Sequence, residues 1–250
     1  RALASQQNEL SMVYQPKVDL RTMKVCSMEA LIRWNNSALG FVPPDEFITI
    51  AEQAGLIEQV TTWVMQQTIA DLAYFRAKGY GFTVAMNLST QDIQNKVLLR
   101  KLVALLTQEG LSPEALELEI TESDLVADAS LAIENLNELT ARGFHFAIDD
   151  FGTGYSSLAY LKNLPVTTIK IDKSFILALA SDENDQQIVH TVLSLASVFN
   201  LKVVAEGVED VASLEILKDW GCDIVQGYYI SRPLSRSDLE DWLQNTPFGE

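Results

Sequence analysis

Short apolar segments alternate with longer amphipathic ones along most of the chain, and turn residues separate them. The apolar segments have the length of β-strands, whereas the longer ones carry apolar residues at helical spacing, such as Val64, Ile69 and Leu72. This alternation predicts parallel strands joined by right-handed helical crossovers. The eight segments predicted as strands are 11–15, 24–34, 82–88, 116–121, 144–149, 167–172, 202–207 and 224–230.

Helix boundaries follow from local start and stop signals. Pro43 and Pro44 introduce one helix, while Gly79 and Gly143 each stand where a helix ends. The predicted helices are 44–54, 61–78, 91–109, 128–142, 156–161, 185–200 and 211–220.

Eight strands favour a closed α/β barrel over an open sheet. A chain of 250 residues with 48% hydrophobic residues can bury one core of that size. The first two strands are joined by only a few residues around 19–23, too few for a crossover helix. We therefore expect the first strand to run antiparallel to its neighbour.

Polar side chains stand at or near the end of six of the predicted strands. Barrel active sites form at the carboxyl ends of strands, so these side chains predict one polar site at the barrel mouth. Strand alternation places five of them on the same face as smaller or polar residues, which should line the barrel interior. These five are Glu29, Asn87, Glu119, Asp149 and Lys170. The side chains are Glu29, Asn87, Glu119, Asp149, Asp150, Lys170 and Glu206.

The adjacent carboxylates of Asp149 and Asp150 open a loop that contains Gly152 and Gly154. Two neighbouring carboxylates cannot both lose water without a compensating cation, which a metal ion would supply. Oxygen donors suit magnesium or manganese, and with only His145 and His190 in the chain a histidine zinc site is disfavoured.

Two metal ions sharing a carboxylate could activate water for attack on a phosphodiester. Asp149 could bridge the two ions, and Asp150 could bind the second. Glu206 could accept a proton from the attacking water, and Lys170 could orient that water or stabilise phosphate charge.

Charge and composition limit which binding partners and which cellular environment we expect for this chain. A net charge of −16 argues against binding of polymeric DNA or RNA, but not against a small anion beside metal ions. Cys26 and Cys222 favour reduced thiols in a cytosolic domain over a disulfide, and no apolar run is long enough to span a bilayer. We expect a single domain over 1–250 that belongs to a longer protein, with 1–10 as the connection to another module. Whether that longer protein is attached to a membrane stays open.

Several short motifs resemble those of the EAL phosphodiesterase family, in the same order and over essentially the whole chain. The motifs are "YQP" at Tyr14, "EALIRW" at Glu29, "NLS" at Asn87, "EITE" at Glu119, "DDFGTGYSSL" at Asp149, "IKID" at Ile169, "AEGVE" at Ala205 and "QGY" at Gln226. The resemblance implies a modified TIM (β/α)8 barrel that uses magnesium or manganese to hydrolyse cyclic di-GMP to linear pGpG.

The resemblance also implies roles for individual residues. Lys170 and Glu206 correspond to a water-orienting lysine and a proposed general base, and Arg33 to an arginine that reaches a substrate phosphate. Glu122 corresponds to a glutamate that holds the 149–158 loop, and the helix after that loop implies a homodimer. The implied metal ligands are Glu29, Asn87, Glu119, Asp149 and Asp150, and Gln15, Leu31 and Gln226 are implied to border the substrate or the metal-bound waters.

Two other functions remain open from the sequence. A catalytically silent member of the same family would bind cyclic di-GMP as a receptor without turnover. A barrel with a lysine could also be a Schiff-base aldolase, with Lys170 as the nucleophile. The carboxylates expected around Lys170 count against that reaction because they keep a lysine protonated.

Overall fold

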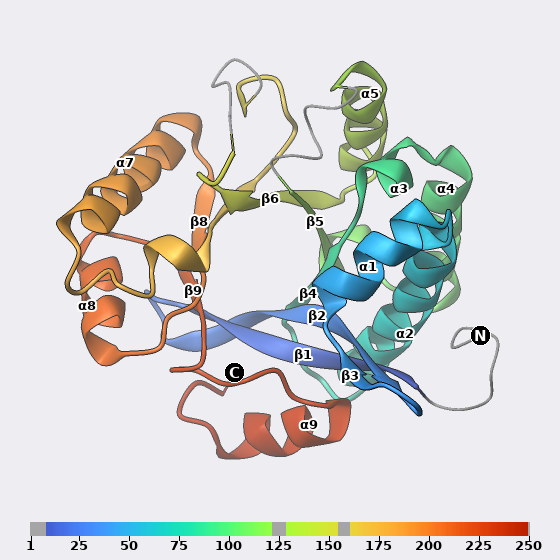
Figure 1. Cartoon of the computed structure of the whole chain (residues 1–250), viewed down its shortest axis with the longest axis horizontal. Helices are drawn as coiled ribbons and strands as arrows, with labels where there is room; N and C mark the ends of the chain where they lie inside the picture. The colour runs from blue at the N-terminus through green and yellow to red at the C-terminus, as the bar shows by residue number, and fades with distance from the viewer. Residues whose placement is uncertain (1–8, 122–128, 155–160, 250) are drawn as a thin grey trace.

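A computed structural model describes residues 9–121, 129–154 and 161–249, in which strands form a closed ring with helices around its outside (Figure 1). The order around the ring is β1-β9-β8-β7-β6-β5-β4-β2, the β1–β2 pairing closes it, and β3 (Gly40–Val42) extends β2. The closed α/β barrel predicted from the sequence is therefore confirmed. The ring strands are β1 (Leu10–Asp19), β2 (Lys24–Asn36), β4 (Thr83–Asn87), β5 (Leu116–Thr121), β6 (His145–Phe151), β7 (Thr168–Ile171), β8 (Lys202–Ala205) and β9 (Ile224–Gln226).

The first strand runs against its neighbours, as predicted. β1 pairs antiparallel with both β2 and β9, whereas the other neighbouring pairs in the ring are parallel. A tight turn joins β1 to β2, and Met23 N donates to Asp19 O across it. The registers place Gln15 opposite Glu29, and Lys17 opposite both Ser27 and Gln226. β1 therefore contributes side chains to the barrel interior although it runs in the opposite direction to the other ring strands.

Helices cover the outside of this ring (Figure 1). No described helix combines the length and the apolar character that a membrane span requires. The helix expected at 156–161 lies almost entirely outside the described residues. The helices are α1 (Pro44–Gln53), α2 (Ile57–Ala77), α3 (Thr90–Gln94), α4 (Lys96–Gln108), α5 (Ala129–Thr140), α7 (Glu183–Phe199), α8 (Val211–Asp219) and α9 (Arg236–Asn245), with 3₁₀ turns η1 (Pro113–Ala115) and η3 (Lys173–Phe175).

The single helix predicted over 91–109 is wrong, because the chain breaks at Asn95. Asn95 has a ψ of 89°, and its side chain accepts hydrogen bonds from Val97 N and Leu98 N, which caps α4. An asparagine offers the backbone this alternative to helical bonding. The carbonyl of Ile93, which the break leaves without a helical partner, accepts from Asn135 of α5 at 2.8 Å.

The helix α9, which lies beside β1 and α2, was not predicted, although Ser235 caps its start (Figure 1). Polar contacts hold it there. Asp71 of α2 accepts from Tyr14 of β1 and from Arg236 of α9, both at 2.7 Å, and Tyr74 donates to Glu240 at 2.7 Å. Because α9 carries few apolar residues, its docking depends on partners that are distant in the sequence.

Side-chain alternation divides each strand between the barrel interior and the helical layer. Inside, Thr83 donates to Ser27 at 3.0 Å, and Thr168 donates to Glu117 at 2.8 Å. This confirms the prediction that the smaller and polar residues line the barrel. The opposite faces are fully buried under the helices and comprise Val84, Met86, Leu118, Ile120, Phe146, Ile148, Ile169 and Ile171.

We predict that Asn95→Ala lowers the free energy of unfolding by about 0.5–2 kcal/mol, because it removes the cap of α4. Chemical denaturation monitored by circular dichroism measures the change. The control is Gln91→Ala, an exposed position in α3, which should stay within roughly 0.5 kcal/mol of the parent protein. Equal stability of the two variants would show that the Asn95 cap does not stabilise this break.

Candidate active site

Lys170 lies at the centre of the polar site and is fully buried. Its Nζ contacts carboxylates from four other strands or strand ends: Glu119 at 2.6 Å, Glu206 at 2.8 Å, Asp149 at 3.0 Å and Glu29 at 3.7 Å. The carboxyl ends of β5, β6, β7 and β8 thus meet around one ammonium group, and Glu29 reaches it from the middle of β2. The structure brings together the charged residues that the sequence predicted at this end of the barrel.

The carboxylates form two clusters that share Asp149. Glu29, Glu119 and Asp149 each present an oxygen within 4.8 Å of the others, and Asp149, Asp150 and Glu206 do the same. Carboxylate oxygens are the ligands that magnesium and manganese prefer. The clusters can therefore hold a metal ion, and Glu206 is a member of the second cluster together with Asp150.

A bulge in β6 lets two consecutive carboxylates reach the same cluster. In a regular strand Asp149 and Asp150 would point to opposite faces. The β6–β7 register is irregular between Ile148 and Phe151, and Asp150 has a φ of 53°, in the left-handed region. Asp150 N also donates to Asp149 Oδ1 at 2.9 Å. This local conformation, rather than the strand pattern, assembles the second cluster.

Amide side chains orient Glu29. Gln226 Nε2 donates to Glu29 Oε2 at 2.6 Å and to Gln15 Oε1 at 3.0 Å, and Asn87 Nδ2 donates to Glu29 Oε1 at 3.2 Å. Gln226 is buried, and its Oε1 has no hydrogen-bond partner among the described residues. One acceptor beside the carboxylates therefore remains available to a further donor.

Sequence analysis missed Lys17, a second fully buried lysine in the barrel. Its Nζ lies 2.5 Å from Glu119 Oε1 and 4.0 Å from Glu117 Oε2. The signal was present, because Lys17 stands two residues after Gln15 and so shares its face of the strand. The predicted site residues stand at or near the ends of predicted strands, whereas Lys17 lies two residues beyond the predicted strand 11–15, in a part of β1 that was not expected to be a strand.

Burial and the lysines set the ionisation of these acids. Burial raises the pKa of Glu119 to about 7 and of Glu206 to about 8, although nearby lysine charge opposes the rise. Burial, followed by the charge of Asp149, raises the pKa of Asp150 to about 6. Burial acts in the same direction on Glu29, but Lys170, Lys17 and the amide hydrogen bonds outweigh it and lower its pKa to about 2.

A pocket of about 490 Å³ opens beside the carboxylates, within the size range of small-molecule sites. Asn87, Asp149 and Asp150 line its inner end, and Leu31 and Arg33 line it from β2. Helices α1 and α2 form the opposite wall. Arg33 is half-buried and donates to the carbonyl of Ile32 at 2.9 Å.

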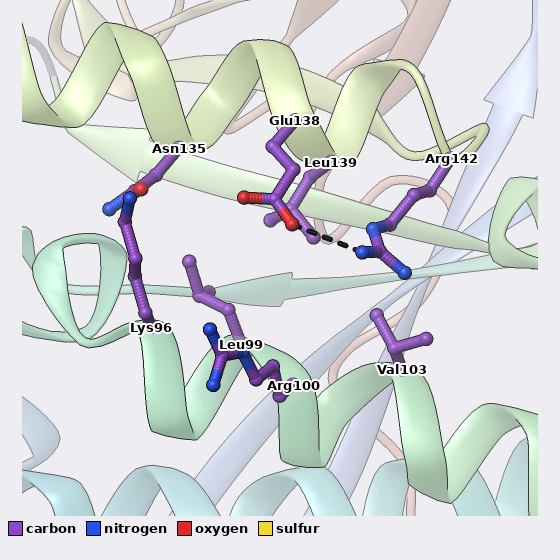
Figure 2. A pocket seen from close by; sticks show the side chains of 8 residues that line it. All are labelled: Lys96, Leu99, Arg100, Val103, Asn135, Glu138, Leu139 and Arg142. Atoms are coloured by element: carbon purple, nitrogen blue, oxygen red, sulfur yellow. Dashed lines mark hydrogen bonds and ion pairs between the residues drawn. The ribbon is translucent and has the colours of Figure 1, made fainter.

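A second hollow lies between α4 and α5 and shares no lining residue with the first (Figure 2). Its volume of about 20 Å³ is enough for roughly one water molecule. Two of the cations in this region are paired, Arg142 with Glu138 at 3.1 Å and Lys96 with Glu134 at 2.9 Å. Its size and its ion pairs distinguish it from the carboxylate site.

Other candidate residues lie apart from this centre or outside the described residues. His145 is exposed, and His190 packs edge-on against Trp220 with ring centroids 5.6 Å apart. Glu122, predicted to hold the 149–158 loop, lies outside the described residues, as does 155–160.

In the presence of chelator, we predict that the melting temperature falls as pH rises from about 5 to about 8. The folded protein holds protons on Glu119, Glu206 and Asp150 more tightly than the unfolded chain does, because their pKa values are raised to about 7, 8 and 6. Stability is therefore lost as pH rises from their usual values through these raised ones. The lowered pKa of Glu29 acts only below this window. Differential scanning fluorimetry across the range measures the effect, and a melting temperature that rises or stays constant would contradict it.

Comparison with known proteins places this arrangement in a family. The sequence model of the EAL domain matches residues 1–233. A cyclic di-GMP phosphodiesterase of Pseudomonas aeruginosa is 41% identical over 93% of this chain, and the phosphodiesterase NbdA of the same organism is 38% identical over 96%. The chain spans 40% of the first relative's length and 31% of the second's.

Solved structures agree in fold. The phosphodiesterase PaMucR in complex with c-di-GMP superposes with a TM-score of 0.89 at 38% identity, covering 94% of this chain and 95% of that one. The FimX EAL domain of P. aeruginosa bound to c-di-GMP gives a TM-score of 0.83 at 30% identity, covering 94% and 93%. With a family match over most of its length, a shared barrel and polar residues at the positions of the family motifs, this chain belongs to the EAL domain family.

Proposed function

We propose that this chain is a metal-dependent phosphodiesterase that hydrolyses one phosphodiester bond of cyclic di-GMP and releases linear pGpG. The observation that carries the proposal is the convergence of Glu29, Glu119, Asp149 and Glu206 on Lys170, beside an open pocket. Two relatives are cyclic di-GMP phosphodiesterases, and two structural neighbours were solved with c-di-GMP bound. Both facts support the choice of substrate.

The donor set fits two magnesium or manganese ions. Glu29, Asn87, Glu119 and Asp149 would hold the first, and Asp149 with Asp150 the second, in line with the two clusters that share Asp149. The unpartnered oxygen of buried Gln226 fits an acceptor for a water near these ions. When bound, the ions would activate water and neutralise phosphodiester charge.

The residues around the ions would control the proton and the water. Glu206 is the proposed proton acceptor, and its raised pKa is consistent with a carboxylate that can take up a proton near neutral pH. Lys170 is the proposed water-orienting group, because its ammonium lies 2.8 Å from Glu206 and 3.0 Å from Asp149. It can donate to an oxygen placed between them.

The substrate would occupy the 490 Å³ pocket. Arg33 is the proposed phosphate ligand, since it lines the pocket on the same strand as Glu29 and has no carboxylate within ion-pair distance among the described residues. Leu31 would contact the nucleotide from the same strand, and Gln15 would border it from β1. Gln226 links Gln15 to Glu29 and so connects the nucleotide side of the site to the metal side.

The environment of Lys170 supports hydrolysis over Schiff-base chemistry. Burial alone would lower its pKa, but Glu119, Glu206, Glu29 and Asp149 together raise it well above its usual value. An ammonium held in this way is a poor nucleophile, whereas it is suited to orienting water or stabilising anionic charge.

We also propose that the domain forms a homodimer through the helix that follows the 149–158 loop, with Glu122 holding that loop. These elements lie outside the described residues, so the support is the resemblance of the "DDFGTGYSSL" and "EITE" motifs. Multi-angle light scattering tests the assembly, and a monomer at tens of micromolar would contradict it.

We predict that Glu206→Gln lowers turnover of cyclic di-GMP by about 10²- to 10⁴-fold, because it removes the proton acceptor. The assay is conversion to pGpG by liquid chromatography with magnesium, with manganese and with chelator. The matched control is Glu209→Gln, the same change at an exposed position three residues away, which should retain activity. Metal-induced stabilisation of both variants should resemble that of the parent protein.

The outcomes separate the alternatives. Tight binding of cyclic di-GMP without product, in any divalent metal, would make the chain a receptor. Loss of metal-induced stabilisation in Glu206→Gln would make Glu206 a metal ligand instead of a proton acceptor.

We predict that Arg33→Ala weakens binding of cyclic di-GMP by about 10- to 100-fold, as expected for the loss of a charged hydrogen bond to phosphate. Isothermal titration calorimetry measures the dissociation constant. The control is Arg21→Ala, an exposed arginine in the turn between β1 and β2, at the opposite end of the barrel. Similar affinity in both variants would exclude Arg33 as a phosphate ligand.

A further inference from the structure

We propose that Lys17 is a positioning residue that fixes one oxygen of Glu119, so that the other oxygen faces the metal cluster. This inference rests on the proposed metal-dependent function, because Glu119 is one of the proposed ligands. Lys17 itself lies one residue pair deeper in the barrel than Gln15 and touches none of the other proposed ligands within ion-pair distance among the described residues.

The two oxygens of Glu119 are divided between two lysines. Lys17 Nζ lies 2.5 Å from Oε1, and Lys170 Nζ lies 2.6 Å from Oε2. Lys170 also contacts Asp149 and Glu206, whereas the nearest carboxylates to Lys17 are Glu119 and Glu117. Oε2 therefore faces the carboxylate clusters, and Oε1 faces the floor beneath them.

Lys17 is itself held in place from below. Glu117 Oε2 lies 4.0 Å from its Nζ, and Glu117 Oε1 accepts from Thr168 at 2.8 Å. Lys17, Glu117 and Thr168 thus form a polar layer under the metal ligands. Its members come from β1, β5 and β7, so the layer links three strands across the barrel.

This arrangement has a consequence for metal binding. An ion held by Oε2 of Glu119 would replace the contact between that oxygen and Lys170, whereas the contact between Oε1 and Lys17 would persist. Ligating carboxylates are commonly oriented by a hydrogen bond at the oxygen that does not bind the metal, and loss of such a partner typically costs about 10- to 100-fold in metal affinity or activity.

A plain counter-ion role makes the opposite prediction. If Lys17 only neutralised Glu119, removing it would raise the pKa of Glu119, so the titrations are made at a pH above that pKa. Under that condition the cluster would be more negative without Lys17, and a divalent ion would bind as tightly as before or more tightly. If Lys17 positions Glu119, removing it weakens the ion even though the cluster becomes more negative. The direction of the affinity change therefore distinguishes the two roles.

The first variant is Lys17→Met, which keeps an unbranched side chain and removes the charged donor. We expect the dissociation constant for manganese, measured by calorimetry, to rise about 10- to 100-fold. The manganese concentration for half-maximal rise in melting temperature should increase accordingly. At saturating manganese, kcat and KM for cyclic di-GMP should approach the parent values, because Lys17 is not among the residues that line the pocket proposed for the substrate. The control is Lys202→Met, an exposed lysine at the start of β8, which should bind manganese normally.

A second variant covers the case in which Lys17→Met does not fold. Lys17→Arg keeps the charge but places a larger planar group in a fully buried position, so it displaces Glu119. If Lys17 positions Glu119, this variant should bind manganese more weakly than the parent protein. If Lys17 only compensates the charge of Glu119, the variant should bind manganese with the parent affinity.

Unchanged or tighter manganese binding in Lys17→Met, or parent affinity in Lys17→Arg, would overturn the proposal for Lys17. If manganese does not stabilise the parent protein either, the proposed metal-dependent function fails instead. The two failures are therefore distinguishable in one set of titrations.

Discussion

The structure depends on how negative charge is compensated inside the barrel. Glu119, Glu206 and Asp149 lie within 3.0 Å of one buried ammonium, that of Lys170. Buried carboxylates are stable only when paired, and one lysine cannot neutralise all of them. Burial raises the pKa values of Glu119, Glu206 and Asp150, and the surplus negative charge adds to this rise. The same surplus charge makes a divalent cation a fitting occupant. The proposed metal binding and catalysis and the predicted pH dependence are consequences of the same electrostatic constraint.

The barrel supplies this constraint through its strand directions. Parallel strands bring their carboxyl ends to one mouth, so acids from β2, β5 and β6 meet there although they are far apart in sequence. The antiparallel β1 adds residues from the opposite chain direction, which is how Gln15 and Lys17 enter the same interior. Ala85 and Ala147 are buried beside the proposed metal ligands, and their small side chains leave room for the polar residues in the barrel interior.

Much of the fold could be predicted from local pattern, and two helices differ from the prediction. The eight ring strands and the direction of the first follow from alternation and from the length of the first connection. The helix predicted over 91–109 is interrupted because the Asn95 side chain caps a new helix, while Asn135 from α5 satisfies the freed carbonyl of Ile93. The α9 helix was missed although Ser235 caps its start and Leu239 and Leu243 are buried at helical spacing. Contacts across the fold, such as that between Arg236 and Asp71, decide where this helix docks.

The sequence by itself determined which chemical groups the site contains and at which end of the barrel they stand, because strand period and strand ends are local properties of the chain. Only the tertiary structure decided how those groups are oriented and which of them are in contact. The bulge that turns Asp150 toward the same cluster as Asp149, and the division of the Glu119 oxygens between Lys170 and Lys17, arise when the ring closes. Registers and contacts across the barrel depend on that closure, and no local pattern encodes them.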